Sequence, residues 1–273
     1  MHGGKIGMTA DQARLIYFSP TQTTKKIVSA IADGLQAESI KHLDLTLPEA
    51  ESSAPEEIRN GLAIIGVPVH GGRVPLLAVE RLRLLRARKI PAVIVVVYGN
   101  RAYDDALLEL RDLSVELGFV PFAAGAFIAE HSYATEKMPI ANGRPDKEDL
   151  EKAREFGWMI RERLEQINLQ AYLPRLAVPG NLPYKERWPQ PRATPITHAE
   201  LCTRCERCAV LCPTRAITME GIAVSDADRC IICCACVKLC PDGARSLTDE
   251  HVRKRADAVS MQCQERKEPE LHM

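Results

Sequence analysis

Residues 202–213 read CTRCERCAVLCP, and residues 230–241 read CIICCACVKLCP. In both stretches the cysteines are separated by two, two and three residues, and a proline follows the last cysteine. A segment this short and this rich in cysteine has little apolar surface to bury. We therefore expect bound metal, rather than an apolar core, to organise the fold of this part of the chain.

The spacing Cys-x2-Cys-x2-Cys-x3-Cys-Pro is typical of the run that holds [4Fe-4S] clusters in pairs, where the fourth cysteine of each run ligates the other cluster. The sequence therefore predicts two clusters with exchanged ligands. The predicted ligand sets are Cys202, Cys205, Cys208 and Cys240 for one cluster and Cys230, Cys233, Cys236 and Cys212 for the other. Zinc is the alternative, but zinc sites usually separate two CxxC pairs by a longer loop.

Composition limits the other possibilities. A length of 273 residues favours two domains. With 36 basic and 36 acidic side chains, the charge gives no reason to expect nucleic acid or a membrane surface as partner. Because Met1–Lys5 lacks the apolar core of a signal peptide and no stretch approaches the length of a membrane span, we expect a cytoplasmic protein. Two further cysteines, Cys234 and Cys263, are expected to be a packed small residue and a tail thiol.

Residues 13–170 alternate short β-branched runs with longer helical patterns, which predicts a five-stranded parallel sheet covered by helices on both faces. The expected strands are 13–18, 40–45, 62–67, 92–98 and 121–128, and the expected helices are 27–35, 76–85, 107–117 and 146–167. Residues 52–60 are few and have hardly any apolar residues at helical spacing, so we expect a brief helix or a turn there.

The rest of the chain divides into three predicted parts after a first domain at 1–170. Six prolines at 171–197 indicate an extended linker that wraps along the first domain. Residues 198–247 form the small α+β domain with the clusters, including a hairpin that turns at Glu220-Gly221. Residues 248–273 are a charged and polar tail, with one or two helical turns between Asp249 and Met261.

Parallel sheets of this kind bind ligands beyond the carboxyl ends of the strands, where the strand order reverses. The loop after the first expected strand places four hydroxyls at the start of a helix, whose free N–H groups suit a phosphate; they belong to Ser19, Thr21, Thr23 and Thr24. No GxGxxG or GxxxxGK[ST] motif is present, which argues against a dinucleotide or a nucleoside triphosphate. The loops at 68–75 and 98–105 contribute glycines that let the backbone approach a planar ring.

Residues 13–168 resemble a flavodoxin domain, and with the cysteine runs the whole chain resembles the flavodoxin–ferredoxin fusion proteins of anaerobic microbes. The resemblance implies non-covalent FMN, with phosphate at the four hydroxyls and the ring between the other two loops. The implied ring-binding residues are Pro68, His70, Gly71, Gly72, Tyr98, Gly99, Asn100, Arg101 and Tyr103. The chain departs from the family in three places, since Pro20 and Gln22 stand where many relatives have glycine and His70 stands where many have an aromatic residue.

These features predict an electron-transfer protein that couples two-electron FMN to two one-electron clusters and exchanges electrons with a redox protein partner. A second hypothesis is a flavin-dependent oxidoreductase that reduces a small substrate, with His131 or Tyr103 as proton donor. A third is a ferredoxin whose first domain is a flavin-free docking module. The identity of the partner, the direction of electron flow and the oligomeric state are left open by the sequence.

Overall fold

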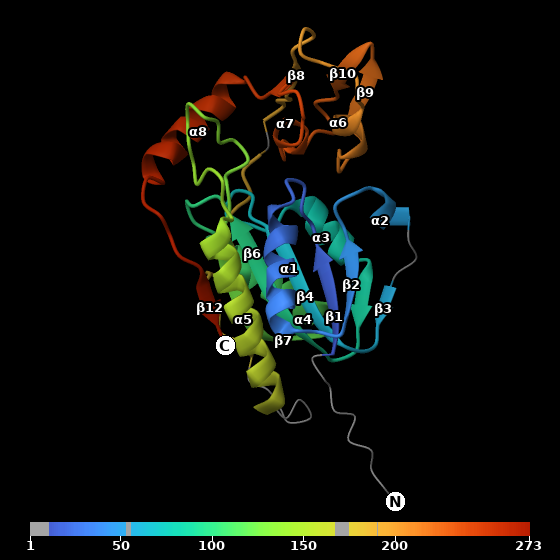
Figure 1. Ribbon diagram of the computed structural model, residues 1–273, viewed down its shortest axis with the longest axis vertical. Helices are drawn as coiled ribbons and strands as arrows, with labels where there is room; N and C mark the ends of the chain where they lie inside the picture. The colour runs from blue at the N-terminus through green and yellow to red at the C-terminus, as the bar shows by residue number, and fades with distance from the viewer. Residues whose placement is uncertain (1–10, 53–55, 167–174, 190) are drawn as a thin grey trace, which may run out of the picture.

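Five parallel strands form the centre of the first part of the chain in the computed structural model, which describes residues 11–52, 56–166, 175–189 and 191–273. The strands are β1 (Gln12–Tyr17), β2 (Ser39–Asp44), β4 (Leu62–Pro68), β6 (Ile90–Tyr98) and β7 (Phe119–Ile128). They lie side by side in the order β2-β1-β4-β6-β7 (Figure 1). This is the flavodoxin-like doubly wound order, and its reversal lies between β1 and β4.

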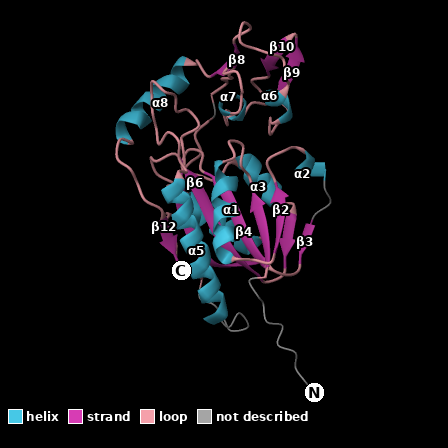
Figure 2. Cartoon of the chain, viewed as in Figure 1, coloured by secondary structure: helices cyan, strands magenta, loops and turns pink. Residues whose placement is uncertain are grey.

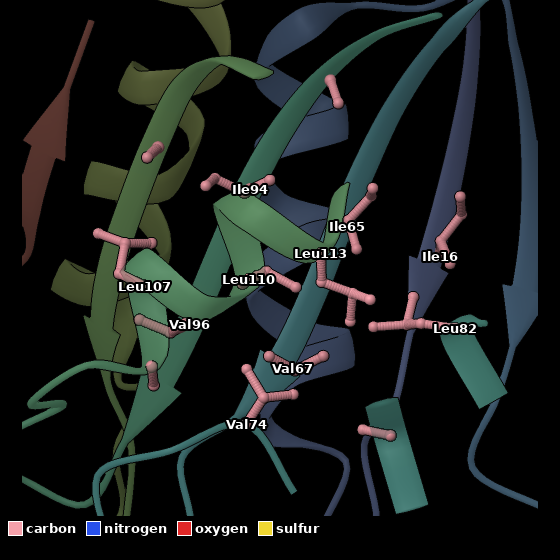
Figure 3. Packing of buried hydrophobic residues seen from close by; sticks show 14 of the residues in the cluster. Ile16, Ile65, Val67, Val74, Leu82, Ile94, Val96, Leu107, Leu110 and Leu113 are labelled. Carbon is pink, nitrogen blue, oxygen red and sulfur yellow. The ribbon is translucent and has the colours of Figure 1, made fainter. Parts of the chain in front are cut away.

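Helices cover both faces of this sheet, as Figure 2 shows. One layer contains α1 (Thr23–Leu35) and α5 (Lys147–Gln166), and the other contains α3 (Leu76–Leu82) and α4 (Ala106–Glu116). All nine residues of β6 are buried, as expected for a strand covered on both sides. In Figure 3 the leucines of α4 lie over the aliphatic side chains of β4 and β6. The expectation of a helix-covered parallel sheet is confirmed.

The sheet has a sixth strand that the sequence did not indicate. Strand β12 (Glu270–His272) pairs antiparallel with β7, with Leu271 opposite Gly125. An edge strand of a sheet presents unpaired N–H and C=O groups, and three residues of the C-terminal tail satisfy part of that edge. The prediction of five strands is therefore correct for the parallel part of the sheet and wrong for the whole.

The prediction for residues 52–60 is also wrong in part. A short helix, α2 (Glu49–Ser52), precedes this stretch, and β3 (Glu56–Ile58) pairs in parallel with β5 (Leu85–Ala87). Residues 53–55 lie outside the described part of the chain. Ile58 is fully buried in the apolar cluster on the α4 side of the sheet. The burial of Ile58 against other segments favours the extended conformation of β3. Local sequence propensity gives no sign of this packing.

A small domain lies beyond the carboxyl ends of the parallel strands (Figure 1). Its elements are β8 (Ile196–Thr197), α6 (Arg207–Val210), β9 (Ile217–Glu220), β10 (Ile222–Ser225), α7 (Ala235–Lys238) and β11 (Arg245–Ser246). Strands β9 and β10 form the predicted hairpin, in which Gly221 takes a φ of 79° at the turn. Strand β8 pairs antiparallel with β11 and so joins the two ends of the domain.

The described part of the proline-rich segment, 175–189, lies along the first domain as expected. The carboxylate of Asp105 accepts hydrogen bonds from the backbone N–H groups of Asn181 (2.8 Å) and Lys185 (2.6 Å). Tyr184 donates its hydroxyl proton to Asp112 of α4 over 2.7 Å. Residues 171–174 and 190 of the predicted linker, and Ile167 at the predicted end of α5, lie outside the described residues.

The C-terminal tail is more ordered than the sequence suggested. Helix α8 (Glu250–Gln262) has thirteen residues rather than one or two turns, and the carboxylate of Asp249 caps it by accepting from Val252 N over 3.0 Å. Val252, Ala256 and Ser260 are buried at a spacing of four residues. This apolar stripe is narrow and lies in a strongly charged segment, so the hydrophobic pattern alone understates the helix.

The packing of α1 against α5, which positions the loop after β1, requires close contact of the two backbones. A Cβ atom added at Gly157 of α5 would lie 2.0 Å from the carbonyl oxygen of Ile31 in α1. We predict that Gly157→Ala lowers the free energy of unfolding by about 1–3 kcal/mol, because the helices must separate. Denaturant unfolding measures this loss. The solvent-exposed Glu155→Ala on the same helix is the control and should change it by less than about 0.5 kcal/mol. Equal stability of the two variants would contradict the close crossing.

Candidate metal centres and cofactor loops

The eight cysteines of the two runs surround two separate hollows of the small domain. Cys202, Cys205, Cys208 and Cys240 line the first. Cys212, Cys230, Cys233 and Cys236 line the second. The hollows measure about 330 and 350 Å³, space open to solvent included. In each set, three cysteines of one run meet the fourth cysteine of the other, so the structure brings together the same two sets that the spacing predicts.

Left-handed residues wrap each run around its hollow. In the first run Arg204 and Glu206 take φ values of 61° and 60°, and in the second Ile232 and Cys234 take 51° and 58°. Alternation of left- and right-handed residues turns successive N–H groups toward one side and makes a concave anion site, as at many iron–sulfur centres. One hydrogen bond from a backbone N–H group to a cysteine sulfur is present: Ala216 N donates to Cys212 Sγ over 3.2 Å.

A buried cation beside Cys236 of the second set, Arg245, has no acidic partner among the residues that the structure describes. Only 3% of Arg245 is exposed. Its recorded hydrogen bonds go to Thr197, Ala223, Ser225 and Cys236, and none of these acceptors is a carboxylate. An unpaired buried cation is costly, so an anion is expected beside it. Thiolate-ligated clusters are negatively charged, and the residues present therefore fit [4Fe-4S] clusters on charge as well as on ligand number.

Burial sets the protonation of the thiols in the absence of iron. It raises the pKa of Cys233 to about 12 and that of Cys236 to about 11, with the positive charge of Arg245 acting in the opposite direction on Cys236. Burial also raises the pKa of Cys208 and Cys230. Metal binding must displace these protons. Among the described residues, no three His, Cys, Asp or Glu side chains are grouped closely enough to hold a single metal ion.

The two hollows differ in what surrounds them. Around the first, Cys205 is exposed, and so is Val210, at 67%. The second faces the first domain: Pro213 O accepts a 2.7 Å hydrogen bond from Arg81 of α3, and Ile231 packs against the apolar cluster under α4. Lys238 adds a contact from α7 by donating to Ala134 O over 2.6 Å. The second cysteine set is therefore the one adjacent to the strand ends.

The loop after β1 forms the start of α1 and presents a cradle for an anion. Ser19 N donates to Thr46 Oγ1 (2.8 Å), and Ser19 Oγ accepts from Lys25 N (3.0 Å). Gln22 takes a φ of 67°, so it adopts the left-handed conformation at a position where many relatives of the resembled family have glycine. The hydroxyl of Thr24 is buried and has no hydrogen-bond partner in the described chain. A phosphate oxygen would satisfy this group, so the loop fits the phosphate of FMN.

The loop after β4 is a tight turn beside the loop after β6. His70 and Arg73 pair through their backbones, and Gly71 and Gly72 between them have φ values of 61° and 84°. Two successive positive φ values define a turn that glycine favours. Gly72 O accepts from Asp105 N over 3.0 Å, whereas a Cβ atom at Gly71 would meet open space. Of the two glycines, Gly71 is therefore the one with room for a ring, and Pro68 lies behind it at the end of β4.

The C-terminal tail engages several residues of the third loop. Asn100 donates through Nδ2 to the carbonyl oxygens of Cys263 (3.1 Å) and Glu265 (2.8 Å). Tyr103 donates its hydroxyl proton to Glu270 over 2.6 Å and contacts the ring of Tyr98 edge-on. Burial raises the pKa of Tyr98 to about 12 and, with Glu270, also raises the pKa of Tyr103. Sequence patterns gave no signal that residues 263–270 would contact this loop.

The other predicted groups of the third loop lie at its open side. Arg101 pairs with Asp104, and its carbonyl oxygen accepts from Lys267. The backbone of Gly99 supports the ring of His131, because a Cβ atom there would lie 2.4 Å from His131 Cδ2.

His131 also contacts Tyr133 edge-on, and its Nδ1 accepts from Tyr133 N over 3.1 Å. Burial, with a smaller contribution from the positive charge of Lys238, lowers the pKa of His131 to about 4, and burial lowers the pKa of His70 to about 4. Both imidazoles are therefore neutral at pH 7. The two histidines come from different loops, after β4 and after β7.

The leftover cysteines are packed residues. Cys234 lies in a small apolar cluster with Ala193, Ile232 and Val252, and its Sγ contacts Ile232 O. Cys263 is buried against Ala134 and Ile140 of the first domain. Burial raises the pKa of both thiols. Cys263 is thus part of the contact between tail and first domain rather than an exposed tail thiol.

Comparison with known proteins agrees with these observations. Residues 195–218 match a family described as a 4Fe-4S binding domain, which spans the first cysteine run. No curated protein matches the chain. No helix in the described residues has the length and apolar character needed to cross a membrane.

Similar solved structures align with the first part of the chain. A flavodoxin from the domain Archaea is 14% identical with a TM-score of 0.37, and the match covers 56% of this chain and 99% of that one. The flavin mononucleotide-bound flavodoxin of Fusobacterium nucleatum is 14% identical with a TM-score of 0.38, covering 56% and 98%. Rubredoxin oxygen:oxidoreductase from the anaerobe Desulfovibrio gigas is 15% identical with a TM-score of 0.40, covering 59% and 37%.

The fold of the first domain follows from its own strand order, β2-β1-β4-β6-β7, with helices on both faces. The small domain carries the matched 4Fe-4S sequence and gathers its cysteines around hollows. Together these features support a role in electron transfer. The chain joins a flavodoxin-like α/β domain to a C-terminal 4Fe-4S ferredoxin domain.

Proposed function

We propose that the chain is an electron-transfer protein in which FMN at the carboxyl ends of the parallel strands exchanges electrons with two [4Fe-4S] clusters, and the outer cluster exchanges electrons with a redox protein partner. The observation that carries this proposal is the placement of the second cysteine set against the first domain, while Cys205 of the first set is exposed. A relay requires an inner and an outer site of this kind.

The cluster ligands in this proposal are the two sets that surround the hollows. They are Cys202, Cys205, Cys208 and Cys240 for the outer cluster and Cys230, Cys233, Cys236 and Cys212 for the inner cluster. The chain contributes thiolates, the inward-turned N–H groups of the left-handed residues and the charge of Arg245. Hydrogen bonds to sulfur and the local burial set the potentials.

In this proposal the predicted flavin residues have three roles: phosphate binding, contact with the ring and support of the loops. Ser19, Thr21, Thr23 and Thr24 cradle the phosphate at the start of α1, where the buried hydroxyl of Thr24 has no other recorded partner in the described chain. His70, Gly71 and Gly99 border the ring from the loops after β4 and β6. Pro68, Gly72, Tyr98, Asn100, Arg101 and Tyr103 support these loops from behind, since Asn100 and Tyr103 are already bonded to the tail.

FMN supplies two-electron chemistry, and each cluster supplies one-electron chemistry, so their combination can split or merge electron pairs. The chain's own task is to hold these groups at fixed separation. Cys212 and Cys233 of the second cysteine set are buried, Cys230 and Cys236 are half-buried, and Ile231 and Tyr133 pack nearby. These apolar contacts join the inner cluster site to the first domain.

The two other hypotheses are less favoured by the side-chain environments. An oxidoreductase would use His131 or Tyr103 as proton donor, but burial lowers the pKa of His131 to about 4 and the Tyr103 hydroxyl already donates to Glu270. A neutral imidazole and an engaged phenol are poor acids at pH 7. A flavin-free docking module would not need an anion cradle at the start of α1, which contains a buried hydroxyl without a recorded partner in the described chain.

The first prediction concerns cofactor content. Protein purified without oxygen should contain about eight iron atoms per chain, the content of two cubanes, and about one FMN by the proposed single flavin site. Iron and acid-labile sulfide analysis and the flavin absorbance of the released cofactor measure both quantities. The same iron without flavin, and no uptake of added FMN, would reject the relay and leave a ferredoxin with a docking domain.

A second prediction separates a carrier from an enzyme. Chemically reduced protein should be reoxidised rapidly by one-electron protein acceptors such as a cytochrome c, because the exposed Cys205 brings the outer cluster to the surface. Small organic electrophiles should reoxidise it slowly, since His131 contacts Tyr133, which packs against the apolar cluster of the small domain. Stopped-flow absorbance follows both reactions. Rapid turnover of a small electrophile would favour the oxidoreductase.

A third prediction tests the exchange of the fourth ligand between the two runs. Because Cys212 lines the hollow of the second run, Cys212→Ser should perturb the inner cluster, and Cys240→Ser should perturb the outer one. EPR of the reduced protein distinguishes the two, since each variant should retain the signal that the other loses. Cys234→Ala is the control and should retain both signals, because its thiol packs against Val252 instead. Loss of the same signal in both serine variants would refute the exchange.

A fourth prediction tests the phosphate cradle. Thr24→Val removes a buried hydroxyl that has no recorded partner in the described chain, so it should leave the stability of the flavin-free protein unchanged or raise it. If phosphate is the missing partner, FMN affinity should fall about 10-fold, the loss of one hydrogen bond to a charged group. Fluorescence quenching titrations with FMN measure the affinity, with Ser29→Ala on the same helix as control. Equal affinity of wild-type and Thr24→Val protein would move the phosphate elsewhere.

A further inference from the structure

Arg245 borders both cysteine sets. Its Nη2 lies 3.8 Å from Sγ of Cys236, a member of the second set. The same residue lines the hollow of the first set, next to Ala244. It is 3% exposed and begins β11, where it is opposite Thr197 of β8. A single guanidinium therefore lies at the boundary of the two sites.

The charge of this guanidinium is not neutralised by protein. Within the described part of the chain, its hydrogen-bond acceptors are the hydroxyls of Thr197 and Ser225, the carbonyl oxygen of Ala223 and the thiol of Cys236. Its Nε is buried and has no acceptor among the described residues. A positive charge held in this way requires an anion nearby, because protein dipoles alone replace its hydration poorly.

Comparison of the two halves of the small domain indicates that the packing does not demand arginine here. Arg245 stands five residues after Cys240, and Ile217 stands five residues after Cys212. Both residues begin a short strand, and both are buried. The first half thus fills the equivalent place with an aliphatic side chain. The arginine is a property of one half only and calls for an explanation other than packing.

We propose that Arg245 sets the reduction potentials of both clusters by placing an unneutralised positive charge between them. This inference rests on the proposed function, since it requires both clusters. Reduction adds one negative charge to a cluster, and a buried cation close by stabilises that state more than the oxidised state. Its effect is larger on the inner cluster, where the guanidinium also contacts the sulfur of Cys236. Arg245 therefore raises both potentials.

The experiment compares Arg245→Gln, which keeps hydrogen-bond donors without the charge, with Arg245→Lys, which keeps the charge. Full-length protein is prepared without oxygen, its iron content is measured, and midpoint potentials are obtained by mediated titration followed by EPR. Arg245→Gln should shift both midpoints to more negative values, and the inner one further. Arg245→Lys should remain closer to wild type. The control Arg229→Gln removes an exposed positive charge of the same domain. It should shift the two midpoint potentials less than Arg245→Gln does, because solvent screens the charge of Arg229.

Each outcome of this experiment supports or rejects either the role of Arg245 or the proposed function. Wild-type protein without clusters would reject the proposed function itself, before any variant is compared. With clusters present in the wild type, unchanged midpoints in iron-loaded Arg245→Gln would overturn the role of Arg245. Failure of both variants to load iron would also overturn it, since the side chain would then serve the fold alone. Loading of the lysine variant but not the glutamine variant would support it, because the cation itself would be required beside the clusters.

Discussion

The buried guanidinium of Arg81 connects the two domains, and the arrangement of both candidate sites depends on it. Arg81 is 1% exposed and donates through Nη1 to the carbonyl oxygens of Leu45 (2.9 Å) and Thr46 (2.6 Å). Its Nη2 donates to Pro213 O, next to Cys212. Thr46 in turn accepts from Ser19 N. One side chain thus links the anion cradle of the first domain to the inner cysteine set, and because buried polar groups must keep their partners, neither domain can shift without a large cost.

The C-terminal tail provides a second connection, from the opposite side. It leaves the small domain as α8, returns to Asn100 through the carbonyl groups of Cys263 and Glu265, and ends as β12 on the edge of the sheet (Figure 1). Lys267 O accepts a 2.9 Å hydrogen bond from Arg144, which is itself paired with the buried Asp149. A linker alone would leave the small domain free to move. Contacts before and after the small domain restrain it at both ends.

The sequence predicted the parts of this protein that depend on local pattern. The β-branched run of β6 and the repeated cysteine spacing each require only a short stretch of chain; the sheet is found as expected, and the cysteines of each predicted set line one hollow. The parts that failed depend on long-range pairing. Leu271 pairs with Gly125 across more than half the chain, and Ile58 becomes extended because of a core that other segments form. No periodicity in residues 268–273 or 56–58 records those partners, since three-residue strands are selected by tertiary packing.

Sequence analysis has the same limit at the candidate sites. The cysteine motif predicts which residues are ligands, but not which site lies at the surface and which lies against the first domain. The two cysteine runs are equivalent in spacing, yet Cys205 is exposed and its counterpart Cys233 is buried, so a sequence repeat becomes an outer and an inner site only in the fold. Burial disfavours added negative charge, and donors or cations favour it. Two clusters of identical ligation would therefore differ in potential through their surroundings alone. In the function proposed above, the route of electrons would consequently depend on how the small domain contacts the first domain, through Arg81 and the tail, rather than on the cysteine motif.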